Sequence, residues 1–296
     1  MIPFFILFLG MSSLFACLGA LAVGHLVPAV SASALLLALA TAWFLARDFK
    51  LVLNPPPIGV PVFLMYALIF VGIYFHSIFL FFPKSESYWI QDPFNLGDMS
   101  FHWHTIRFLG KGATFWPENP IYMGYRFKYP FGMDFFNALF ENLGVAISSH
   151  LPVVTLLTLV LVFYVLHMAG GPLLVFAIFF SSGMYNFTVP GNWDLNEMQN
   201  TVDFKNLFLT VLLTQRGFGY ALPAGVFLYR ALQECFSGAW KPSFLEKLSL
   251  GMIWGGLGFF HLHSFFFVSM YLGILILWKR DLRNWLLPLG IASLLG

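Results

Sequence analysis

Long apolar runs separated by short polar intervals make up most of this chain. The first three runs cover about residues 2–27, 28–46 and 60–82, and each is long enough to cross a bilayer as a helix. Further apolar runs follow residue 136 and continue to the last residue. The pattern predicts an all-α polytopic membrane protein with about eight or nine transmembrane helices.

Two of the later apolar runs are interrupted. An Ala-Gly-Gly-Pro sequence at 169–172 predicts a tight turn after the preceding span. The run at 250–278 is too long for one ordinary helix, and His261 and His263 lie in its middle. Because Lys279 directly after this run is typical of a cytoplasmic end, we expect two short crossings hinged near the histidines.

We expect a single transmembrane domain over residues 1–296. Residues 1–82 form three N-terminal helices, residues 83–135 form a periplasmic loop with short helices, and residues 136–296 form the remaining helices. Because the chain ends inside an apolar run without a polar tail, we expect it to be the front portion of a longer protein, incomplete at its C-terminus.

The composition excludes a water-soluble protein. Hydrophobic residues make up 59% of the chain and charged residues 9%, against about 25% charged in a soluble domain. The net charge of +2 is too small to indicate a nucleic-acid partner. Cys17 and Cys235 both lie in apolar segments, where packing explains them better than a disulfide does.

Lysine and arginine residues predict the orientation. Arg47 and Lys50 follow the second apolar run, and Lys241 and Lys247 lie in a later polar interval, which indicates that both intervals are cytoplasmic. The loop at 83–135 then lies on the outer face. In a bacterium, this arrangement corresponds to an inner (plasma) membrane protein with its site on the periplasmic face.

The composition of the longest polar interval, residues 97–134, is typical of a functional loop. It is rich in aromatic residues, is punctuated by prolines and carries charges of both signs. A second polar interval at 185–206 is expected on the same face. Two polar segments on one face predict a site between them.

Asp98 and His102 are the candidate catalytic residues of the first interval. They are four residues apart, so on a helix they share one face. A carboxylate beside an imidazole can act as a general base or bind a divalent cation such as Mg²⁺ or Mn²⁺. The alternative, with equal weight, is that Asp98 caps the start of a helix.

Arg126, Lys128 and Tyr129 form a second candidate group. Two cations among aromatic residues near the membrane boundary suit the phosphate of a lipid. The alternative is an interfacial anchor, for which such residues are enriched at membrane surfaces.

Gln215 and Arg216 lie between apolar stretches, where an arginine is costly and usually functional. A guanidinium binds phosphate through two parallel hydrogen bonds, so a pyrophosphate or lipid phosphate is a suitable ligand. The alternative is a structural ion pair with one of three acidic residues of the second polar interval. These are Asp194, Glu197 and Asp203.

His261 and His263 are weaker candidates for substrate binding. Only one residue separates them, so they face different sides of a helix and make a poor pair of metal ligands.

Several motifs together resemble membrane glycosyltransferases of the GT-C superfamily. Gly97-Asp98 is followed by His102, then by Trp-Pro-Glu-Asn-Pro at 116–120 and Tyr-Pro-Phe-Gly-Met-Asp at 129–134. Gln-Arg-Gly-Phe at 215–218 before a helix and Phe-His-Leu-His-Ser at 260–264 inside one are similar to bacterial members.

The resemblance implies transfer of a sugar from a polyprenyl-phosphate carrier to an acceptor at the outer membrane face. Asp98 matches the acidic residue that acts as base or metal ligand in such enzymes. Arg216 or Lys128 would stabilise the leaving phosphate, and the partners would be the lipid-linked donor and membrane lipids. The alternatives are a membrane transporter or lipid flippase, and a non-catalytic envelope assembly protein.

Overall fold

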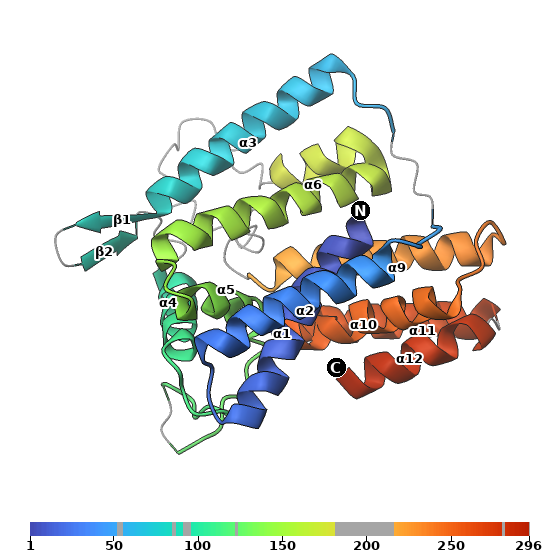
Figure 1. Cartoon of the computed structure of the whole chain (residues 1–296). Helices are drawn as coiled ribbons and strands as arrows, with labels where there is room; N and C mark the ends of the chain where they lie inside the picture. The colour runs from blue at the N-terminus through green and yellow to red at the C-terminus, as the bar shows by residue number, and fades with distance from the viewer. Residues whose placement is uncertain are drawn as a thin grey trace.

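The computed structural model describes residues 1–51, 56–84, 87–90, 96–121, 124–180, 216–279 and 282–295 (Figure 1). In these ranges, three helices are long and apolar enough to cross a membrane: Ile2–Val23, Pro28–Ala46 and Ile147–Phe179. Shorter apolar helices accompany them at Val60–Gly72, Leu262–Trp278 and Trp285–Leu295. The prediction of a helical protein is confirmed, and three of its helices have the length and apolar composition that a membrane span requires. The larger number of spans stays a prediction.

The first three helices lie where the apolar runs predicted them. They are α1 (Ile2–Val23), α2 (Pro28–Ala46) and α3 (Val60–Leu80). Most buried positions of α2 are small, with Ala34, Ala38 and Ala42 almost inaccessible. Large side chains such as Leu36 and Leu37 are exposed. Small residues between helices with large apolar ones outside are typical of packing inside a bilayer.

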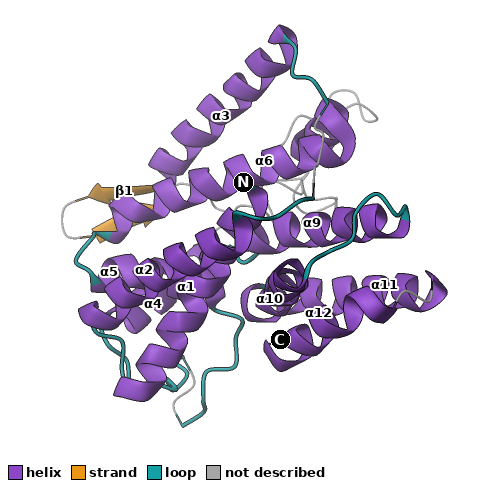
Figure 2. Cartoon of the chain, turned by 45° about the vertical axis from the view of Figure 1, so that its right-hand side comes forward, coloured by secondary structure: helices purple, strands orange, loops and turns teal. Residues whose placement is uncertain are grey.

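The stretch expected to be an outer loop is largely ordered. Strands β1 (Phe81–Lys84) and β2 (Ser87–Ile90) form an antiparallel hairpin, which the sequence analysis did not predict. Helix α4 (Leu96–Gly110) follows. Helix α5 (Gly132–Asn142) already begins inside the expected loop. Figures 1 and 2 show α4 and α5 together at one end of the long helices.

The end of α5 joins three elements through Asn142. Its amide donates to the carbonyls of Gly110, at the end of α4 (2.9 Å), and of Leu26, between α1 and α2 (3.2 Å). Its oxygen accepts a hydrogen bond from Ser31 of α2 (2.9 Å). The chain between α4 and α5 also reaches the α1–α2 turn, because the Phe115 N–H donates to the Gly24 carbonyl at 2.7 Å.

Helix α6 (Ile147–Phe180) contains the predicted turn. Gly170 and Gly171 leave helical geometry, and Gly171 has φ 67°, a region that favours glycine. The turn expected at 169–172 is therefore confirmed.

The last helices are α9 (Phe218–Phe236), α10 (Phe244–Phe260), α11 (Leu262–Lys279) and α12 (Leu282–Leu295). His261 separates α10 from α11 in an extended conformation (φ −156°, ψ 94°). The predicted division of this run into two short helices near the histidines is confirmed, whereas their crossing of the membrane stays a prediction. The expectation that the motif at 260–264 lies inside one helix is wrong, because this break divides it.

Two glycines allow other segments to approach the α10–α11 break closely. A Cβ at Gly132, the first residue of α5, would lie 2.9 Å from the Phe259 carbonyl oxygen. A Cβ at Gly217, just before α9, would overlap the Phe260 carbonyl. The starts of α5 and α9 are therefore packed against the same point.

At the other end of the helices, the buried carboxylate of Glu246 holds two connecting segments together. It accepts hydrogen bonds from the backbone N–H of Lys50 (2.6 Å) and of Ser243 (2.7 Å), and from the indole of Trp240 (3.2 Å). The segment after α2 and the segment before α10 thus lie side by side. This agrees with their predicted location on one side of a membrane.

We expect single cysteines at the two ends to be labelled from opposite sides. Lys111→Cys, after α4, should react with an impermeant maleimide in intact cells, whereas Asp48→Cys, after α2, should react only after permeabilisation. Both positions are exposed, and the native Cys17 and Cys235 are buried, so the unsubstituted chain is the background control. Labelling of Asp48→Cys in intact cells would contradict the orientation.

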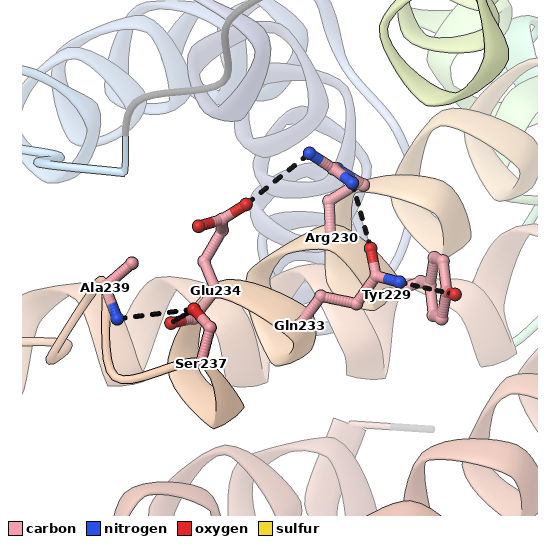
Figure 3. Close-up of polar contacts among 6 residues, drawn as sticks. All are labelled: Tyr229, Arg230, Gln233, Glu234, Ser237 and Ala239. Carbon is pink, nitrogen blue, oxygen red and sulfur yellow. Dashed lines mark hydrogen bonds and ion pairs between the residues drawn. The ribbon is translucent and has the colours of Figure 1, made fainter.

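Glu246→Ala should destabilise the protein, because it leaves one buried and two partly buried donors without an acceptor. We expect the free energy of unfolding to fall by about 3 kcal/mol, measured by thermal or denaturant unfolding in detergent. The matched control is Glu234→Ala, which removes a partly exposed pair with Arg230 at 3.4 Å (Figure 3). Such a pair contributes about 0.5 kcal/mol. Equal losses in the two variants would rule out a special role for Glu246.

Candidate functional site

A group of polar side chains, four of them buried and Arg216 half-buried, gathers where α4, α5, α6 and the turn before α9 meet. It consists of His102, Asp134, Asn137, His150 and Arg216, and we call it the polar cluster. His102 and Asp134 are only 5% and 2% exposed. Polar groups buried this far cost free energy unless they are hydrogen-bonded, so their partners define the site.

The His102–Asp134 pair lies at the centre of the polar cluster. His102 Nδ1 is 2.8 Å from one carboxylate oxygen of Asp134 and 3.0 Å from the other. Asp134 lies in the first turn of α5, where the helix dipole stabilises a negative charge. Because an ionised carboxylate can only accept, Nδ1 is the donor.

Asn137 and His150 extend the polar cluster from α5 to α6. The Asn137 amide donates to the Met133 carbonyl at 2.9 Å, and its oxygen is 3.1 Å from His150 Nδ1. This oxygen can only accept, so His150 Nδ1 donates. His150 Nε2 is buried and has no partner within the described ranges.

Arg216 brings a positive charge to the polar cluster from the turn before α9. One terminal nitrogen donates to the Met99 sulfur at 3.2 Å, and Nε is buried without a partner in the described part of the chain. Burial lowers the pKa of Arg216 to about 10, while the negative charge of Asp134 raises it. Arg216 therefore stays protonated at neutral pH beside Asp134.

A small cavity of about 20 Å³ adjoins Arg216, enough for roughly one water molecule. It is lined by Met133, Asn137, Val154, Thr155, Thr158, Leu159, Arg216 and Gly219. The cavity gives the guanidinium a polar space inside an otherwise apolar bundle.

The structure places the predicted catalytic residues on one helix. Asp98 is the third residue of α4, one turn before His102, and its side chain lies outside the described part of the molecule. Because α4 begins at Leu96, Asp98 lies within the first turn and is not the N-cap residue. A carboxylate there still interacts favourably with the helix dipole.

Arg126, Lys128 and Tyr129 divide into different roles. The Arg126 guanidinium donates to the Trp116 carbonyl at 2.7 Å, which ties together the chain between α4 and α5. Lys128 is exposed. Tyr129 is 39% exposed, and its ring centroid lies 6.2 Å from that of His102 and 4.9 Å from that of Phe101. Tyr129 is thus an exposed ring close to the buried His102.

The histidines of the α10–α11 break stay outside the polar cluster. His261 Nδ1 is 2.8 Å from the Ser264 hydroxyl and accepts from the Ser264 N–H at 3.2 Å, an arrangement that caps the start of α11. His263 is exposed. Gln215 and the acidic residues considered as partners of Arg216 lie outside the described residues: Asp194, Glu197 and Asp203.

The sequence analysis missed Asp134, Asn137 and His150 as site residues. Asp134 and Asn137 are three residues apart and lie among apolar positions that recur at helical spacing. A polar pair at that spacing within an apolar face indicates buried polar partners, and this signal could have identified them.

The chain matches no protein-family model, and it shows no significant similarity to a curated protein or to a solved structure. Among the side chains that the structure describes, no three of His, Cys, Asp and Glu gather closely enough to hold a metal ion.

Proposed function

We propose that this protein is a membrane glycosyltransferase of the GT-C type. It moves a sugar from a polyprenyl-phosphate carrier to an acceptor at the outer membrane face. The observation that carries the proposal is the convergence of His102, Asp134 and Arg216 at one end of an apolar helical bundle. These residues come from separate parts of the sequence, and all three stand in the motifs that resemble the superfamily.

The location of the polar cluster supports a lipid-linked substrate. It lies at the end of the helices that carries α4 and α5, beside the half-exposed Tyr129. A polyprenyl chain would remain in the bilayer while its phosphate and sugar reach this end. An arginine is the side chain best suited to a phosphate there, because it presents two parallel donors.

The reaction is a single displacement at the anomeric carbon. The acceptor oxygen forms the new bond to this carbon as the bond to the phosphate oxygen breaks, and the electron pair leaves with the phosphate. Asp98 takes the proton of the acceptor hydroxyl or orients that hydroxyl. Arg216 and Lys128 stabilise the charge that develops on the phosphate. No step is assigned to a metal ion.

The direct test is transfer by the purified protein from a panel of polyprenyl-phosphate sugars, with Asp98→Asn as the decisive variant. Asn has nearly the size of Asp but cannot take a proton, so we expect normal folding and a turnover lower by roughly a hundredfold. Asp48→Asn, at an exposed position near the other end, is the matched control. Full turnover in a folded Asp98→Asn protein would remove Asp98 from the mechanism.

Arg216→Lys should weaken donor binding, because a point charge replaces a planar group with two parallel donors. We expect the KM for the lipid-linked donor to rise roughly tenfold while the melting temperature changes little. Arg230→Lys in α9 is the matched control, since Arg230 is also a partly buried arginine (Figure 3). A lowered melting temperature with an unchanged KM would show that Arg216 only balances the charge of Asp134.

A further inference from the structure

The two ring nitrogens of His102 have different environments. Nδ1 contacts both oxygens of Asp134. Nε2 has no hydrogen-bond partner among the residues that the structure describes, and the His102 side chain keeps 6% of its surface exposed. His102 therefore uses Nδ1 for its contact with Asp134, and Nε2 remains for a ligand.

Asp134 decides which nitrogen carries the proton. Its carboxylate accepts from Nδ1, which fixes the proton of the neutral imidazole there. With the proton held on Nδ1, Nε2 presents a lone pair.

The surroundings of His102 suit a hydroxyl-rich ligand. The ring of Phe101 lies 5.5 Å from that of His102, and the ring of the exposed Tyr129 lies 6.2 Å from it. Aromatic faces pack against the C–H groups of a sugar ring, while its hydroxyl groups need polar partners. A lone pair beside a half-exposed tyrosine supplies both kinds of contact.

We infer that Asp134 is a positioning residue that holds His102 in the Nδ1–H tautomer, so that Nε2 accepts a hydrogen bond from a substrate hydroxyl. The hydroxyl belongs either to the transferred sugar or to the acceptor. The inference rests on the proposed function for the identity of the ligand. The tautomer itself follows from contacts within the protein.

The tautomer can be measured without any activity. In the full chain with ¹⁵N-labelled histidine, reconstituted in nanodiscs, the His102 nitrogens should show a protonated Nδ1 and an unprotonated Nε2 at neutral pH. The His102→Gln variant identifies these signals by their loss. Asp134→Asn should shift His102 toward the other tautomer, because the Asn amide can also donate to Nδ1. If neutral His102 in the unsubstituted protein carries its proton on Nε2, the inference is overturned.

Two substitutions of His102 separate its two nitrogens. In His102→Asn, the amide can take the place of Nδ1 and still donate to Asp134, but nothing replaces Nε2. In His102→Gln, the amide reaches the place of Nε2, and the bond to Asp134 is lost. We expect His102→Asn to keep the melting temperature and lose turnover by roughly tenfold or more, the effect of one hydrogen bond. His102→Gln should melt lower but retain more of its turnover.

The kinetic constants identify the ligand. A raised KM for the donor in His102→Asn assigns the hydroxyl to the transferred sugar, and a raised KM for the acceptor assigns it to the acceptor. Full activity in His102→Asn would show that His102 serves only to satisfy Asp134, and the inference would fail. If the unsubstituted protein transfers no sugar while the Nδ1–H tautomer is observed, the proposed function fails and the positioning by Asp134 stands.

Discussion

The cost of burying a charge organises this molecule. Asp134 is almost inaccessible in a bundle whose other side chains are mostly apolar, and an unpaired carboxylate there would be strongly destabilising. His102 meets this cost with a hydrogen-bonded donor, and Arg216 meets it with a positive charge. Asp134, His102 and Arg216 belong to α5, α4 and the turn before α9. The need of the buried carboxylate for a donor and a nearby positive charge therefore constrains how these three elements are placed.

A second buried carboxylate has a comparable role at the opposite end of the helices. Glu246 binds the segment after α2 to the start of α10, where it is also part of a capping box with Ser243. Between these two ends, the small residues of α2 let helices pack closely without polar contacts. Polar interactions at the two ends therefore specify how the helices are arranged, and apolar side chains fill the space between the helices.

Local structure was predictable from the sequence where one segment carries the whole signal. The bounds of α2, the glycine turn in α6 and the separation of α10 from α11 follow from apolar run lengths, glycines and charges within short windows. The polar cluster was only partly predictable. His102 and Arg216 were recognised as candidate site residues, but the hydrogen-bond partner of His102 is Asp134, which is 32 residues away in the sequence. Spacing along a chain does not reveal such a contact, because it depends on how α4 packs against α5. The β1–β2 hairpin was missed for a related reason: its strands are short and give no clear alternating pattern.

The α10–α11 break has a consequence for the electrostatics of the polar cluster. Gly132 packs against it two residues before Asp134, and Gly217 packs against it directly after Arg216. Asp134 and Arg216 are thus both positioned by segments that pack against the backbone of the α10–α11 break. A movement of α10 and α11 as a unit would carry the anion and the cation together and leave their separation nearly constant. A side chain at either glycine would instead displace only one of the two charged residues. It would change the distance between Asp134 and Arg216 without replacing any polar group.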